Sequence, residues 1–154
     1  MKKLLAVLAC VLLSSIVVAE EIGTVSTTFK LLTANDKIVI EAFDDPEIPG
    51  ATCYLSRAKK GGLSGALGVA EDTSDASLAC RQVGPIKLSN EVRQGKRDGE
   101  KVFRKSISIL FKTMQVVRYY DKKRNTLVYL TYSDKLVDGS PKNSVSAIPI
   151  MPWR

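Results

Sequence analysis

Two apolar segments late in the chain, residues 107–120 and 126–132, constrain the fold more than any other feature. Both are rich in β-branched and aromatic residues, which favour β-strands. The five polar residues 121–125 between them predict a turn, so the two segments should pair as an antiparallel hairpin. Because apolar side chains fall on both faces of this hairpin, we expect its strands to lie centrally in a sheet and to be covered on both sides.

Four earlier segments also predict strands, since they are short, rich in Val, Thr, Ile and Tyr, and bounded by turn residues: 24–32, 37–43, 52–57 and 78–83. A helix over 74–81 is an alternative for the fourth segment. Ser89 can cap one short helix over 90–94, which Gly95 would end.

The C-terminal segment 144–150 is expected to be an edge strand or an extended tail, because Pro149 and Pro152 are poorly tolerated in a central strand. Trp153 stands next to the end of the chain. Burial of its ring would pin the tail to the body.

The first nineteen residues have the layout of a secretory signal peptide: a basic start, an apolar middle and small residues before the cleavage site. The apolar run of about 15 residues is shorter than the roughly 20 that span a bilayer, which argues against a membrane anchor. Lipid attachment at Cys10 is a further alternative, but only six apolar residues precede it. We therefore expect residues 1–19 to be removed after Ala19, leaving a mature domain of residues 20–154.

Removal of the leader leaves two cysteines, Cys53 and Cys80. An even pair in an exported chain predicts a disulfide, which would stabilise the fold by roughly 3–4 kcal/mol through loop closure. A reactive thiol pair is the alternative, although the chain has no C-x-x-C motif. The predicted fold class is mainly β, or α+β with a dominant antiparallel sheet, in a single domain with one short helix and one disulfide.

The chain contains no histidine, which excludes histidine-based triads and most zinc and haem sites. Its net charge is +7, and it falls to +5 once the two lysines of the leader are removed. This charge favours weak attraction to anionic surfaces. We expect no cofactor and no metal, no nucleic-acid partner outside the cytoplasm, and no stable membrane span after cleavage.

A glycine-rich segment after two lysines is the most unusual stretch of the sequence. Glycines let the backbone approach a ligand closely, and lysines attract anions. The candidate ligand or partner surface consists of these residues and two nearby aspartates: Lys59, Lys60, Gly61, Gly62, Gly65, Gly68, Asp72 and Asp75. A flexible loop inside the disulfide ring is the alternative interpretation.

The signals for catalysis are weaker. Ser56 and Lys59 match the S-x-x-K motif of penicillin-recognising enzymes, but the companion motifs S-D-N and K-T-G are absent. The acidic clusters 44–47 and 71–75 offer calcium-type ligands, yet turn and cap chemistry explains them equally well. We assign no catalytic and no metal-ligating residue.

Several long segments closely resemble the CreA family of small exported proteins from Gram-negative bacteria: 20–23, 37–46 (KIVIEAFDDP), 52–59 (TCYLSRAK), 70–76 (AEDTSDA), 82–86 (QVGPI), 111–120 and 140–153. The resemblance runs over essentially the whole mature chain. It implies a single domain in the periplasm. It carries no catalytic residue, since the family has no established biochemistry.

The leading hypothesis is a non-enzymatic periplasmic binding or accessory module whose partner is an unknown protein or envelope ligand. One alternative is a hydrolase that acts on an envelope component without histidine. Another is a structural or envelope-stress factor that associates with anionic envelope polymers. The sequence leaves the oligomeric state open.

Overall fold

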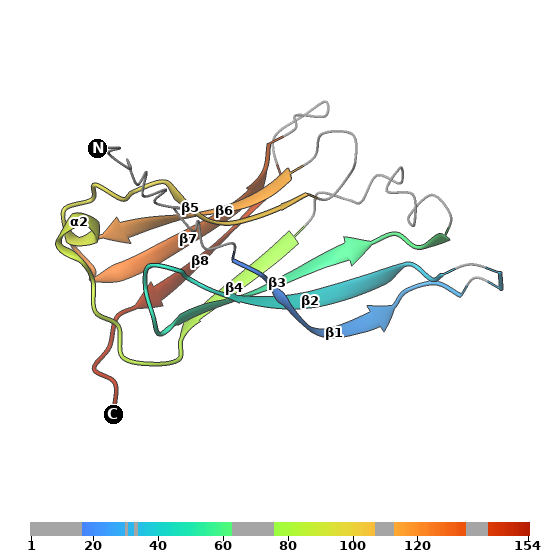
Figure 1. Cartoon of the computed structure of the whole chain (residues 1–154), viewed down its shortest axis with the longest axis horizontal. Helices are drawn as coiled ribbons and strands as arrows, with labels where there is room; N and C mark the ends of the chain where they lie inside the picture. The colour runs from blue at the N-terminus through green and yellow to red at the C-terminus, as the bar shows by residue number, and fades with distance from the viewer. Residues whose placement is uncertain (1–16, 30, 33, 63–75, 107–112, 135–141) are drawn as a thin grey trace, which may run out of the picture.

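Two antiparallel sheets face each other in the computed structural model, which describes residues 17–29, 31–32, 34–62, 76–106, 113–134 and 142–154 (Figure 1). Within these residues, each sheet has four strands, and strands that follow one another in sequence also pair in space. The first sheet contains β1 (Glu20–Ser26), β2 (Lys37–Asp44), β3 (Ala51–Lys59) and β4 (Ala76–Gln82). The second contains β5 (Glu100–Ser106), β6 (Thr113–Asp121), β7 (Thr126–Ser133) and β8 (Asn143–Pro149). The predicted mainly β class is confirmed.

A short helix, α2 (Asn90–Arg93), connects the two sheets, as predicted. The Ser89 hydroxyl accepts a hydrogen bond from the Val92 N–H at 3.3 Å, so it caps the helix. Gly95 follows the helix with a φ of +75°, a conformation that glycine adopts at little cost. No helix in the described part of the chain is long and apolar enough to cross a bilayer.

The predicted hairpin is the centre of the second sheet. Strands β6 and β7 pair without interruption from Met114 opposite Ser133 to Asp121 opposite Thr126, and β5 flanks β6 on its other side. Residues 114–118 are buried on both faces of β6, so the expectation of a covered central strand is confirmed. Residues 107–112, the start of the predicted strand, lie outside the described residues.

The core between the sheets is built by alternation along the strands. On β2, Val39, Glu41 and Phe43 are buried while the residues between them are more exposed. The Phe43 ring stacks on Phe103 of β5 with centroids 4.3 Å apart, which joins the two sheets directly.

Cys53 and Cys80 lie directly opposite each other on β3 and β4 and form the predicted disulfide. Strand predictions 52–57 and 78–83 are confirmed. The alternative helix over 74–81 is wrong where the structure describes it, because residues 76–82 pair with β3 as a strand.

The free edge of β4 is closed by β8. The N–H groups of Leu78 and Cys80 donate to the hydroxyls of Ser144 and Ser146, at 3.4 and 2.8 Å. Because side-chain hydroxyls take the place of a neighbouring strand's carbonyls, this edge presents fewer open donors to other chains.

The C-terminal tail is held by amide contacts. The Gln82 side chain donates to the Met151 carbonyl at 2.9 Å and accepts from the Met151 N–H at 3.0 Å. Trp153 is 52% exposed, so the expectation that its buried ring pins the tail is wrong. The predicted edge strand is confirmed as β8, which ends at Pro149.

A Cys53→Ala, Cys80→Ala double variant, which lacks the disulfide, should be measurably less stable than the parent protein. The lost loop constraint should cost about 3–4 kcal/mol of unfolding free energy. Urea unfolding of the oxidised parent and the variant checks this value. Reductant should lower the midpoint of the parent and leave the variant unchanged; a parent that ignores reductant would contradict a stabilising bond.

Candidate functional site

The structure describes half of the predicted ligand surface. Lys59 is the last residue of β3, and Lys60 follows it; both side chains are exposed. Gly61 and Gly62 come next, while the remaining predicted residues lie outside the described part of the chain: Gly65, Gly68, Asp72 and Asp75. The two lysines and the first two glycines therefore stand together at one end of the first sheet.

Gly61, just after the end of β3, contacts the loop that joins β1 and β2. Its N–H donates to Oδ1 of Asp36 at 2.8 Å. A Cβ atom at this position would lie 2.1 Å from the carbonyl oxygen of Ala34, so only glycine permits this approach. Gly62 has a φ of +83°, which also favours glycine. These two glycines thus have a structural role in the described fold.

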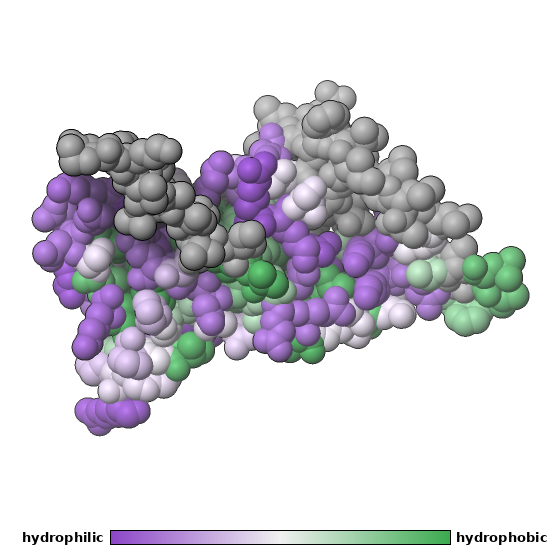
Figure 2. Space-filling view, in the orientation of Figure 1, coloured by the Kyte–Doolittle hydropathy of each residue, from purple (hydrophilic) through white to green (hydrophobic). Residues whose placement is uncertain are grey.

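The loop that Gly61 contacts carries three large apolar side chains in water. Phe29, Leu31 and Leu32 are 83, 84 and 93% exposed. Figure 2 shows green atoms at the far right end of the molecule, where Figure 1 places the connection between β1 and β2. Contiguous exposed apolar side chains commonly mark binding surfaces. We call Phe29, Leu31, Leu32, Lys59 and Lys60 the tip surface.

Sequence reasoning missed the apolar part of the tip surface. The prediction of a strand over 24–32 is wrong at its C-terminal half, because β1 ends at Ser26, which pairs with Lys37. The chain must therefore turn between these two residues. The turn-forming stretch Ala34-Asn35-Asp36 was the available signal.

Lysines also face each other behind the tip. Lys37 of β2 lies directly opposite Lys59 of β3, so their side chains share one face of the sheet. Glu21 approaches Lys37 with an Oε1 to Nζ distance of 3.8 Å. Like charges in this position repel each other, which favours a negatively charged partner nearby.

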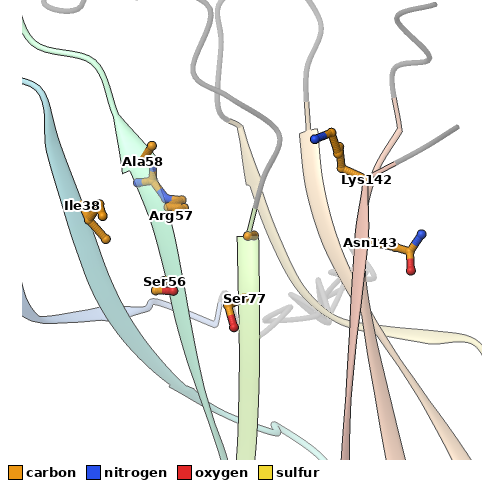
Figure 3. Close-up of a pocket in the computed structure, with 8 residues that line it drawn as sticks. Ile38, Ser56, Arg57, Ala58, Ser77, Lys142 and Asn143 are labelled. Atoms are coloured by element: carbon orange, nitrogen blue, oxygen red, sulfur yellow. The ribbon is translucent and has the colours of Figure 1, made fainter. Parts of the chain in front are cut away.

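Ser56 lines a pocket of about 400 Å³ on the first sheet, beside the start of β8 (Figure 3). Figure 3 shows Ser56 and Ser77 on neighbouring strands, with Lys142 and Asn143 across from them. Residues three apart on a strand point to opposite faces, so Ser56 and Lys59 diverge. The S-x-x-K match therefore does not bring a base to this hydroxyl.

A buried guanidinium lies at the centre of the largest charged cluster among the described residues. Arg118 of β6, 1% exposed, donates from Nη1 to both oxygens of Asp45, at 2.7 and 2.8 Å. Its Nη2 donates to Glu47 and, at 3.1 Å, to Glu100. The Tyr129 hydroxyl donates to the second Asp45 oxygen at 2.9 Å.

The pKa values of this cluster follow from burial and pairing. Burial alone would lower the pKa of Arg118, but the hydrogen bonds and charges of Asp45 and Glu47 together outweigh this effect and raise the pKa. Burial, then the neighbouring Asp45 charge, raise the pKa of Tyr129 far above its ordinary value. Burial and Glu47 raise the pKa of Glu100. At neutral pH the cation is therefore fixed and the tyrosine stays neutral.

A second cluster joins the sheets nearer the tip. Arg57 of β3 donates from Nε to Glu41 of β2 at 3.0 Å, and Lys105 of β5 also donates to Glu41. Burial would raise the pKa of Glu41, but the hydrogen bonds from Arg57 and Lys105 outweigh it and hold the pKa below its ordinary value. Within the described residues, no three Asp, Glu, His or Cys side chains group as metal ligands.

The acidic cluster 44–47 performs turn chemistry. Oδ1 of Asp45 accepts the N–H groups of Glu47 and Ile48, at 2.9 and 3.2 Å. The interpretation of these residues as turn and cap residues is thus confirmed. The other cluster, 71–75, lies outside the described residues.

Arg118→Met should lower the unfolding free energy by about 3–5 kcal/mol, because it leaves Asp45 buried without its counter-charge. Urea unfolding at neutral pH measures the loss. Adding Asp45→Asn to the same chain should recover part of it, since the amide keeps an acceptor and carries no charge. Arg124→Met is the control: its exposed pair with Asp121 should contribute less than about 1 kcal/mol. Equal losses in the two single variants would contradict the assignment.

The chain is similar to known proteins over nearly its whole length. A family model described as CreA protein matches residues 22–153. Protein CreA of Escherichia coli strain K12 is 58% identical over 153 residues, which cover 99% of this chain and 98% of the relative. Protein CreA of Escherichia coli O157:H7 has the same identity and coverage. No solved structure matches the chain. Because both the family model and the relatives extend over nearly all of its length, the chain belongs to the CreA family.

Proposed function

We propose that this chain is an exported, non-enzymatic binding protein of the cell envelope, and that the tip surface is where it binds. The observation that carries the proposal is the exposure of Phe29, Leu31 and Leu32 beside lysines at one end of the molecule. Water-exposed apolar side chains of this size gain free energy when a partner covers them. Nearby lysines give that partner a preferred charge.

The charged interior supports binding over hydrolysis. An activated serine needs a base within hydrogen-bond reach, and the S-x-x-K pair on β3 diverges. In the described part of the chain, Arg118 with Asp45 and Lys105 with Glu41 form ion pairs that join the two sheets, and Arg57 pairs with Glu41 within the first sheet. These groups are therefore engaged in structural pairs, although Arg57 also lines the pocket beside Ser56.

Export is supported by the layout of residues 1–19 and by the disulfide, since structural disulfides persist in oxidising compartments. The periplasm is the compartment that fits a Gram-negative source.

Processing should produce a mature chain that begins at Glu20. Intact-mass measurement of protein recovered from the periplasmic fraction checks the cleavage position. An Ala19→Arg variant should remain unprocessed, because the cleavage site requires a small residue. Val17 and Ala19 pack against the core in the full chain, so the processed protein must also be shown to be folded. Recovery of an uncleaved chain in the cytoplasm, or of lipid on Cys10, would contradict this proposal.

Photo-crosslinking in cells should produce specific adducts from a reactive residue placed at Leu31. The same probe at Lys123 is the matched control, because this residue is exposed in the turn between β6 and β7, at the opposite end from the tip. Mass spectrometry identifies each adduct as protein, polymer or lipid. An equal adduct pattern at the two positions, in folded and exported protein, would reject the tip as the binding surface.

A further inference from the structure

We infer that the tip surface docks on the face of an anionic phospholipid bilayer. The inference rests on the proposed function, since it names the occupant of the same surface. Three properties of the tip surface support the inference: its protruding shape, the lysines behind its apolar apex (Phe29, Leu31 and Leu32), and the hydrogen bonds inside its loop.

The shape of the tip suits a deformable layer. The connection between β1 and β2 lies at the extremity of the molecule, and Leu32 is 93% exposed (Figures 1 and 2). A stable protein interface usually buries about 800 Å² on each partner, far more than three side chains provide. A protrusion that carries Phe29, Leu31 and Leu32 can instead enter the boundary between headgroups and acyl chains without a preformed pocket.

The charge behind the apex selects an anionic surface. Lys37 and Lys59 face each other across β2 and β3, and Lys60 follows at the end of the strand. Among the described residues, two carboxylates lie near them: Glu21 approaches Lys37 at 3.8 Å, and Asp36 accepts the Gly61 N–H. With the apolar apex inserted, the long lysine side chains would reach the headgroups. Their attraction to anionic lipid decays over a Debye length, so it must weaken as salt rises.

Hydrogen bonds inside the loop limit how deep it can enter. The Thr27 N–H donates to the Asp36 carbonyl at 2.8 Å, and the Asp36 N–H donates to the Thr28 hydroxyl at 3.1 Å. At the base of the loop, part of the backbone hydrogen-bonding groups are thus paired within the loop, as is required of any segment near lipid. The strands beyond it carry charged side chains and stay in water. Docking is therefore peripheral and reversible.

Vesicle flotation with the processed, oxidised protein tests this inference. Phosphatidylcholine vesicles containing about one third phosphatidylglycerol should float the protein at low salt, and pure phosphatidylcholine vesicles should float much less. Leu31→Ser with Leu32→Ser should weaken binding about tenfold or more, because it removes the inserted side chains. Both residues are exposed, so circular dichroism and the thermal midpoint should match the parent.

Charge variants separate specific docking from general attraction. Lys59→Glu with Lys60→Glu should reduce binding about tenfold and flatten its salt dependence. Lys122→Glu with Lys123→Glu changes the net charge equally at the other end of the molecule and should alter binding less than about twofold. Equal losses in the two charge variants would show attraction by net charge alone and would overturn the inference.

The two proposals fail in different ways. Folded protein that floats with no vesicle, yet crosslinks one protein from Leu31 in cells, would overturn lipid docking and leave the tip as a binding surface. Folded protein with neither vesicle binding nor specific adducts would overturn both. Undiminished binding by the leucine variant would show that the apolar apex does not insert, which also overturns the inference.

Discussion

The buried guanidinium of Arg118 sets the relation between the two sheets. It extends from β6 of the second sheet to Asp45, in the connection between β2 and β3 of the first. The same carboxylate accepts the N–H groups that shape this connection, including that of Ile48. A buried ion pair must compensate the loss of hydration of both partners, and here Tyr129, Glu47 and Glu100 supply further hydrogen bonds. The start of β3, and through it the disulfide, is therefore positioned by one cation.

Links between the sheets continue from this cluster toward the tip. The stacked rings of Phe43 and Phe103 come next, and the bonds of Glu41 to Arg57 and Lys105 follow. Strands β2 and β3 are thus supported from the second sheet along their length. The loop between β1 and β2 receives its support from the strand ends and from Gly61, which leaves its apolar side chains exposed. A rigid scaffold that presents a protruding loop is a common arrangement for recognition.

Local chemistry explains what could be predicted from the sequence. The Ser89 cap and the central hairpin can be recognised from a few neighbouring residues, and the cysteine pair from residue type alone. The tip was missed because residues 24–32 are rich in Val, Thr and Phe, which favour strands, and because composition does not distinguish an exposed loop. The partner of Arg118 is 73 residues away, and no spacing rule encodes such a pairing. In the glycine-rich segment, the sequence placed Gly61 on a ligand surface; its close approach to the Ala34 carbonyl is a structural role that depends on a residue far away in the sequence.

The meander order of both sheets has a consequence for the order in which the chain can acquire its structure. All strand pairs of the first sheet, and its disulfide, involve residues 20–82, so this half can assemble before the second half is in place. Contacts between neighbouring strands close small loops and form quickly. The bonds made by Arg118 and Lys105 require the second half and must therefore form later. Until then Asp45 lacks the second sheet that covers it and stays hydrated, so the folding chain avoids burying this carboxylate without its counter-charge.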